Sequence, residues 1–343
     1  MKPFLAALLF LLISGISISY AQKVVDKKKF FQDTSLINAT LTLNIKNVMA
    51  KKDKVGYIFP ATFACNLGDS LNIADKVSIE VRGHFRRGYC YLPPIKMIFK
   101  SNPSAAFYHL KSLKLVNACM ATRSDDQNLL KEYLIYKIYN LITDKSFRVR
   151  LLNLNFQDSS GKKKTITQHA FLIEDIKEVA KRNDCKDWTE NKVATRLTDR
   201  RQTTIVSIFE YMIGNTDWSI PVNHNVKLLK SKSDSLSRAY VVPYDYDFSG
   251  LVGTTYSAPD ERLGIASVKE RLYRGFPRSM EEINDVLDVF NKQKANIYAT
   301  INNFNLLTPA TKKEMTTYLD GFYKTINDPS EVKRIFITEA RTQ

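Results

Sequence analysis

The feature that most constrains the fold is a change in hydrophobic periodicity near residue 174. Before it, apolar and polar residues alternate in short runs, as they do in half-buried strands. These runs lie at 36–45, 77–82, 95–99, 113–116, 147–156 and 165–173. After residue 174, apolar residues recur at helical spacing, apart from a short pair of strands at 225–230 and 238–242. The pattern predicts an α+β fold with a sheet-rich part followed by a mostly helical part.

Capping signals place the ends of the expected helices. Ser124 and Gln127 have the spacing of a capping box and predict one helix within the sheet-rich part. Gly214 is expected to end a helix that contains residues 205–213. Two later helices are expected to start at Ser279 with Glu282 and at Thr308 before Pro309.

The first segment has the pattern of an export signal. Lys2 precedes an apolar stretch over 4–18, and Ser19-Tyr20-Ala21 forms a small-residue cleavage site. The stretch is short for a membrane span, and no later run of about 18 apolar residues exists. We therefore expect an exported protein, periplasmic or secreted, that is soluble after cleavage and has no membrane span. Its expected parts are a signal peptide (1–21), a sheet-rich part (22–174) and a helical part (175–343).

The charge balance favours anionic partners. Lys and Arg number 51 against 35 Asp and Glu, which gives a net charge of +16. Such a charge suits phosphate esters, nucleotides, nucleic acid or acidic glycans, without choosing among them. The hydrophobic content of 44% excludes a disordered chain. The four cysteines allow three pairings, and we expect structural disulfides or buried thiols among Cys65, Cys90, Cys119 and Cys185.

Polar residues gather in two segments that each follow an apolar helix or strand. The first contains Asp217 and Asn225, and the second contains Asp245 and Asp247. Phosphoryl transfer requires an aspartate that accepts the proton of the attacking hydroxyl, together with Asn and Asp oxygens that hold Mg²⁺ against the phosphates. In an extended segment Asp245 and Asp247 would share one face and repel each other unless a cation lay between them. The pattern indicates a magnesium site for phosphoryl transfer, although simple Asx turns would also account for these residues.

Motifs in this region resemble the catalytic segment of the CotH-like (spore-coat protein H) kinases, a family of secreted, atypical kinases. The motifs are Gly214-Asn-Thr-Asp-Trp-Ser219, His224-Asn-Val-Lys227 and Pro243-Tyr-Asp-Tyr-Asp-Phe248. Arg82-Gly-His-Phe-Arg-Arg87 resembles the Arg-Gly loop of that family, and Phe171-Leu-Ile-Glu174 resembles its strand before the hinge. The resemblance covers about residues 77–250. It implies a two-lobed protein-kinase-like fold, with an N-terminal antiparallel sheet lobe that carries one helix and binds nucleotide, and a mostly helical C-terminal catalytic lobe.

The resemblance also implies a role for each matched residue. Asp217 would be the catalytic carboxylate, Asn225 a metal ligand, and Asp245 or Asp247 the aspartate that joins Mg²⁺ to the phosphates of ATP. The remaining implied roles are phosphate contacts from Arg82, Arg86 and Arg87, neutralisation of the α- and β-phosphates by Lys96 or Lys114 with Glu132 as an ion-pair partner, and adenine contact by the backbone around Glu174.

The implied function is transfer of the ATP γ-phosphoryl group to a protein hydroxyl, with a nucleotide and a protein substrate as partners. The loop between Asp217 and Asn225 is longer than in the family, so Asn223 competes with Asn225 for the metal. The phosphate-covering turn contains only Gly83 and Gly88, which keeps open an inactive, pseudokinase-like envelope protein that binds an anionic ligand or a partner protein.

Two further interpretations remain from the residues alone. One is a cationic surface protein for nucleic acid or acidic glycan, although no specific nucleic-acid module is recognisable. The other is a glycoside hydrolase that uses Asp217 and Asp247 as paired carboxylates.

Overall fold

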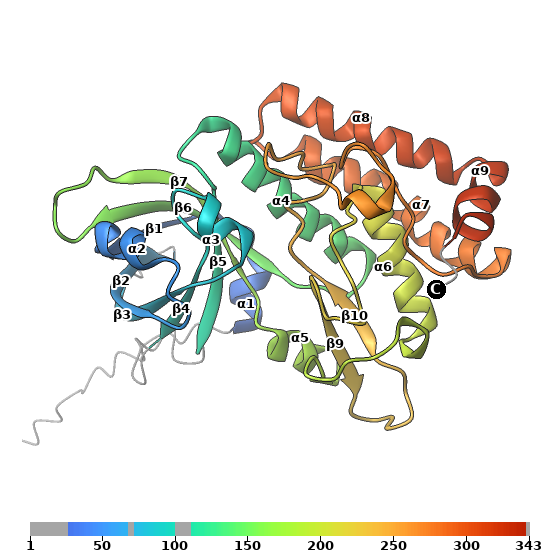
Figure 1. Cartoon of the computed structure of the whole chain (residues 1–343), viewed down its shortest axis with the longest axis horizontal. Coiled ribbons are helices and arrows are strands. Elements are labelled where there is room, and N and C mark those ends of the chain that lie inside the picture. The colour runs from blue at the N-terminus through green and yellow to red at the C-terminus, as the bar shows by residue number, and fades with distance from the viewer. Residues whose placement is uncertain (1–26, 68–71, 100–110, 341–343) are drawn as a thin grey trace, which may run out of the picture.

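The computed structural model of the chain describes residues 27–67, 72–99 and 111–340. The predicted signal peptide (1–21) lies outside these residues. Figure 1 shows a barrel of strands on one side, a group of helices on the other, and helix α4 (Arg123–Ile142) between them. The predicted boundary at residues 174 and 175 falls between the last barrel strand and the next helix.

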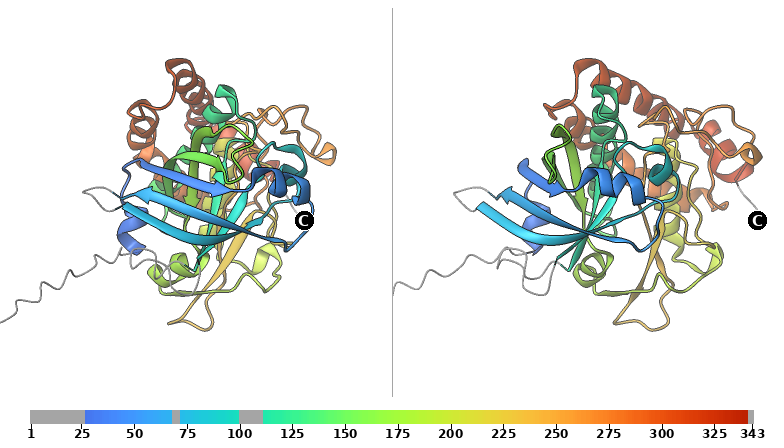
Figure 2. Two further views of the ribbon diagram at one scale, coloured as in Figure 1. Left: turned by 90° about the vertical axis from the view of Figure 1, so that its left-hand side faces the viewer. Right: turned by 60° about the vertical axis from the view of Figure 1, so that its left-hand side comes forward.

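Seven strands of the described part close into a barrel in the order β1-β2-β3-β4-β5-β7-β6. Neighbouring strands are antiparallel except β1 and β6, which run parallel and place Leu41 opposite Phe156. Buried and more exposed residues alternate along β1 and β3, so one face of these strands fills the interior (Figure 2). The strands are β1 (Ile37–Leu43), β2 (Ile58–Asn66), β3 (Asn72–Val81), β4 (Ile95–Phe99), β5 (Ser112–Asn117), β6 (Val149–Asp158) and β7 (Ile166–Ile173).

The prediction of a two-lobed, kinase-like arrangement with an antiparallel sheet lobe and one helix is wrong. The strands form a closed barrel of mixed direction. Besides α4, this part of the chain forms α1 (Lys27–Gln32), α2 (Ile45–Lys51) and α3 (Phe85–Tyr89). The error has a physical cause: alternation shows which face of a strand is buried, but not which distant strand pairs with its edge. The parallel pairing of β1 with β6 joins residues 115 positions apart in sequence and leaves no local signal.

The second part of the chain is mostly helical. It contains a small sheet in the order β10-β9-β8, which lies below the helices in Figure 1. Its elements are α5 (Ile176–Arg182), β8 (Cys185–Asp187), α6 (Arg200–Ile213), β9 (Val226–Ser231), β10 (Tyr240–Pro243), α7 (Met280–Asn302), α8 (Pro309–Ile326) and α9 (Pro329–Lys333), with short 3₁₀ turns at Thr195–Leu197 and Glu261–Leu263 and a π turn at Arg334–Thr338.

Helix α4 joins the two parts because it packs against β6 and β7 on one side and against α7 on the other. Residues all around this helix are buried, including Leu130, Ile135 and Ile138. The predicted capping box at its start is wrong. Thr122 is the N-cap, and the Gln127 side chain instead bonds the backbone of the segment before α8.

The other capping predictions are confirmed. Gly214 ends α6 in the left-handed conformation, Ser279 and Glu282 form a complete capping box, and Thr308 caps α8 before Pro309. Cys90 and Cys119 form a disulfide, whereas Cys65 and Cys185 are buried thiols. No helix within the described ranges combines the length and the apolar character that a membrane crossing needs.

Candidate functional site

The segment after α6 holds Asp217 in a defined position. Gly214 turns the chain at φ 67°, and a Cβ atom there would lie 2.0 Å from the Tyr318 hydroxyl oxygen, so a larger residue would clash. The Asn215 side-chain oxygen then accepts a hydrogen bond from the Asp217 N–H at 3.0 Å. The end of α6 therefore fixes the backbone position of Asp217.

Two residues support this loop from behind. Arg274, from the long segment before α7, donates hydrogen bonds to the carbonyls of Thr216 and Trp218, which flank Asp217 in sequence. Glu210, one turn before the end of α6, is only 1% exposed. Burial raises the pKa of Glu210 to about 8. The Asn215 amide lowers that pKa by lying against the carboxyl group, although neither Glu210 oxygen makes a hydrogen bond of normal geometry.

The Asp217 carboxylate is bound by both predicted and unpredicted neighbours. Asn225 Nδ2 donates to Asp217 Oδ2 at 3.0 Å and to the Asp217 carbonyl at 2.7 Å. His224 Nε2 lies 2.7 Å from Asp217 Oδ1, with the two side chains 51% and 40% exposed. The Asn223 side chain turns away and donates to the Thr189 carbonyl at 2.7 Å. Asn225, rather than Asn223, therefore lies with Asp217.

The aspartates after β10 lie deeper. Asp245 has φ 69°, so Asp245 and Asp247 do not lie in an extended segment, and the Asp245 N–H donates to the Tyr136 hydroxyl at 2.9 Å. Asp247 is 5% exposed, and its Oδ2 accepts a hydrogen bond from the Tyr256 hydroxyl at 2.8 Å. Burial raises the pKa of Asp247 to about 6, and the charges of Asp245 and Asp217 add to that rise. The expected repulsion between Asp245 and Asp247 is therefore present, although the backbone between them is not extended.

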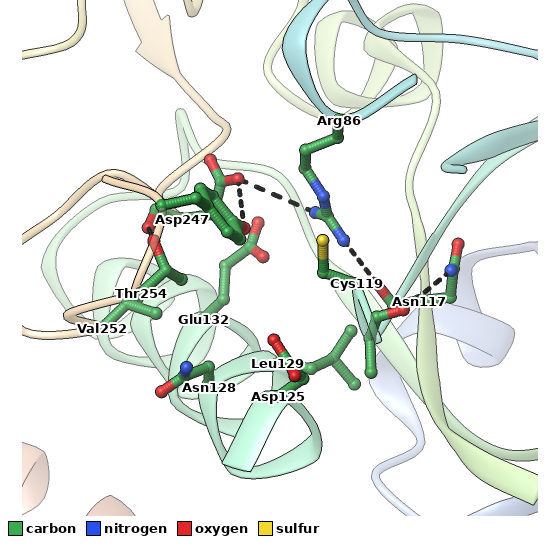
Figure 3. Close-up of a pocket in the computed structure, with 12 residues that line it drawn as sticks. Arg86, Asn117, Cys119, Asp125, Asn128, Leu129, Glu132, Asp247, Val252 and Thr254 are labelled. Atoms are coloured by element: carbon green, nitrogen blue, oxygen red, sulfur yellow. Dashed lines mark hydrogen bonds and ion pairs between the residues drawn. The ribbon is translucent and has the colours of Figure 1, made fainter. Parts of the chain in front are cut away.

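Glu132 from α4 completes an acidic centre, by which we mean Glu132, Asp245 and Asp247. It is 2% exposed, its Oε1 has no hydrogen-bond partner, and burial and the Asp247 charge raise its pKa well above the ordinary value. The cation that faces it is Arg86, which points down from α3 between Asp247 and the end of β5 (Figure 3). In the described part of the chain, no ion pair joins Glu132 to Lys96 or Lys114, the partners expected from sequence.

Cationic side chains line the side of the site next to Asp245. Lys114 on β5 lies with its Nζ 4.5 Å from the centre of the Tyr244 ring, and Lys227 on β9 lies 5.6 Å from the same ring. Burial, together with the charges of Arg82 and Lys227, lowers the pKa of Lys114 to about 8. Lys96 on β4 pairs in register with Lys114, which places both side chains on the same face of the barrel. These four cations, Arg82, Lys96, Lys114 and Lys227, are named here the basic wall.

The remaining predicted residues lie at the margins. Arg87 follows Arg86 on α3, but no ion pair joins it to the acidic centre among the described residues. Glu174 forms an ion pair with Arg182 at 3.2 Å, and its N–H donates to the Arg148 carbonyl at 2.9 Å. The side chain of Glu174 thus binds α5, and its N–H binds the residue before β6.

The donor set suits a hard divalent cation. Asp247 and Glu132 supply only oxygen, and Glu132 Oε1 is a buried acceptor without a donor. Within the described ranges, no group of three His, Cys, Asp or Glu side chains is arranged to hold a metal ion. Mg²⁺ is commonly held by one or two carboxylates together with substrate phosphates, so the carboxylates of Glu132 and Asp247 would suit an ion that arrives with a nucleotide.

A hollow of about 560 Å³ opens beside Asp217. Apolar side chains line part of it, namely Val222, Phe248 and Leu263. Its charged rim residues Asp260 and Arg262 pair with each other. The hollow therefore combines apolar side chains with one paired couple of rim charges next to the exposed Asp217 carboxylate.

Several of these residues escaped the sequence analysis. Lys227 and His224 were part of a quoted motif but received no role, and Lys227 follows the alternation of an ordinary strand. Tyr256 and Arg274 lie in the long segment between β10 and α7, where no periodicity or motif marks them. Only their tertiary contacts with Asp247 and with the Asp217 loop identify them.

No protein-family model matches the chain, and no curated protein matches it at a significant level.

Proposed function

We propose that this protein is an exported phosphotransferase of the CotH-like kinase type, which transfers the γ-phosphoryl group of ATP to a protein hydroxyl with Mg²⁺. The observation that carries the proposal is the contact of Asp217 with Asn225, next to an acidic centre that faces a basic wall. An oxygen-rich centre and a row of cations on its border are the two surfaces that a metal-bound triphosphate needs.

Each part of the site has a task in this proposal. Asp217 is exposed enough to meet an acceptor hydroxyl and accept its proton, while His224 and Asn225 orient its two oxygens. Asn225 and Asp247 would hold Mg²⁺, with Asp245 and Glu132 adding negative charge. The ion, when bound, screens the phosphate charge as the phosphoryl group departs.

The basic wall would bind the phosphates on the other side. Lys114 and Lys227 converge on the Tyr244 ring, and Arg82 lies close enough for its charge to lower the pKa of Lys114. Crowded cations repel one another, and an anionic ligand would relieve that repulsion. Polyphosphate binding is therefore the favoured use of this wall.

The acceptor would approach through the hollow beside Asp217. Because the rim charges Asp260 and Arg262 pair with each other, the hollow suits an uncharged stretch of polypeptide around the hydroxyl. Replacing Leu263 with Asp should weaken phosphorylation of an added protein while leaving ATP hydrolysis in place.

A second function is favoured by one contact. Arg86 lies against Asp247, where a metal ligand would need to be available. A protein that binds a nucleotide or another anion without turnover, as a pseudokinase-like envelope protein would, is consistent with this arrangement.

The test is phosphoryl transfer by the purified mature chain, measured as ATP hydrolysis, self-phosphorylation and phosphorylation of added proteins with Mg²⁺. We expect Asp217→Ala and Asp247→Ala to abolish all three signals. Asp288→Ala, an exposed change on α7, is the control and should keep wild-type activity. Equal activity in all four proteins would remove the catalytic assignment. Stabilisation by ATP without any turnover would instead support the binding function.

A further inference from the structure

Arg86 is a buried cation at the centre of the site. Its Nη1 lies 3.9 Å from Asp247 Oδ2, and the two side chains are only 10% and 8% exposed. Burial by itself would lower the pKa of Arg86, but the surrounding Tyr256, Asp247 and Glu132 raise it more. A guanidinium in this position is therefore charged and offsets the charge of the carboxylates around it.

The turn that carries Arg86 is fastened on several sides. The guanidinium donates to the Asn117 carbonyl, and the disulfide between Cys90 and Cys119 joins the end of α3 to the segment after β5. Lys52 Nζ donates to the carbonyls of Gly88 and Cys90, at 3.0 and 3.3 Å. These ties hold the guanidinium close to the acidic centre.

Aromatic contacts connect the same turn to the segment after Asp247. Phe85 lies 5.7 Å from Phe248 and 5.6 Å from Tyr256, measured between ring centres, and Tyr89 lies 5.4 Å from Tyr256. The turn is thus packed onto the segment that contains Asp247 and the tyrosine that binds it. Moving the Arg86 turn away from Asp247 would require these aromatic contacts to break.

The carboxylates that face Arg86 are also the best cation ligands of the site. Glu132 Oε1 has no donor, and Arg86 Nε has no acceptor, so the guanidinium neutralises the carboxylates without saturating them. A divalent cation at Glu132 and Asp247 would be close to Arg86, and two cations in a buried site repel each other strongly.

We propose that Arg86 is a built-in counter-cation that competes with a divalent metal ion for Glu132 and Asp247. The metal then binds weakly by itself and requires an accompanying polyphosphate, or a movement of the Arg86 turn, to enter. The inference takes from the proposed function only the choice of a divalent cation as the competitor.

The test is a titration of the full mature protein with MgCl₂ or MnCl₂ in the absence of nucleotide, followed by thermal unfolding and calorimetry. We expect Arg86→Met to bind the metal about tenfold more tightly than wild type or more, since close buried charge pairs couple by at least about 1.5 kcal/mol. Arg87→Met is the matched control, because it removes a charge from the same turn without touching the acidic centre. Its metal affinity should equal that of wild type.

A second pair of variants keeps the test decisive. Arg86→Lys retains a charge but loses the planar fork, and we expect it to bind metal with intermediate affinity if Arg86→Met does not fold. Adding Glu132→Gln to either Arg86 variant should return the affinity to the wild-type level. Wild-type affinity in every folded Arg86 variant, or an equal gain in Arg87→Met, would overturn the proposal. Neither result depends on ATP turnover, so this inference and the proposed function can fail separately.

Discussion

Replacing Glu210 with Gln should remove the fall in unfolding free energy that Glu210 causes between pH 4.5 and about 8. Glu210 is buried behind the Asp217 loop, and burial raises its pKa from the ordinary value of 4.5 to about 8. At about 1.4 kcal/mol for each unit of pKa, this difference corresponds to roughly 5 kcal/mol of unfolding free energy.

The sign follows from proton binding. Between pH 4.5 and about 8 the folded protein keeps the Glu210 proton while the unfolded chain has lost it. The unfolding free energy contributed by Glu210 is therefore fully present below pH 4.5, falls as the pH rises, and levels off above about pH 8. Glutamine cannot ionise, so the Glu210→Gln protein should not show this fall.

The assay is urea unfolding followed by tryptophan fluorescence at about pH 5 and about pH 8, where linkage predicts that wild type loses roughly 4 kcal/mol more than the variant. Glu281→Gln, an exposed change on α7, is the control and should behave as wild type. If the unfolding free energies of wild type and Glu210→Gln change in parallel over this range, Glu210 is not held in its neutral form and the argument fails.

Two further predictions concern the turn and the basic wall. Changing Cys90 and Cys119 to Ser should lower the unfolding free energy by about 3–4 kcal/mol, since the disulfide closes a loop with a sequence separation of 29, and wild type in reductant should show the same loss. A wild-type protein that is equally stable with and without reductant would contradict this estimate. Lys114→Met should reduce thermal stabilisation by ATP, whereas the exposed Lys163→Met should not. Because burial lowers the pKa of Lys114 to about 8, ATP affinity should also fall above that pH in wild type but not in Lys114→Met.

Local signals in the sequence predicted local structure well. The strand expected at 95–99 is β4, and the capping box of Ser279 and Glu282 starts α7. The strand β2 was missed because Pro60, Thr62 and Ala64 occupy its more exposed positions, and the alternation is therefore weak. The false capping box at Ser124 shows the opposite error, since a suitable spacing was present but Gln127 is used by a distant segment.

In the candidate site, too, contacts within one loop could be predicted from the sequence, whereas contacts between distant segments could not. The contact of Asp217 with Asn225 could be anticipated, because both residues lie in one loop and their types match the chemistry. The choice between Asn223 and Asn225 could not, since both have φ 52° and only the tertiary partner of each side chain separates them. Lys96 or Lys114 was predicted as the ion-pair partner of Glu132, because Lys114 lies on the strand just before α4, whereas the cation whose charge acts on Glu132 is Arg86 on the α3 turn.

The acidic centre is better explained by ligand binding than by a contribution to the stability of the fold. Glu132 lies on a helix whose other buried positions are almost all apolar or aromatic, and packed apolar residues would serve stability there as well as a buried ion pair or better. Asp247, Glu132 and Arg86 instead lie together in this interior, with Glu132 Oε1 and Arg86 Nε left without partners. Side chains that are buried, charged and incompletely satisfied are costly for the folded state, and they concentrate where a protein binds or transforms a charged ligand. The cost is explained if the missing partners are supplied by an ion or a phosphate when the ligand arrives.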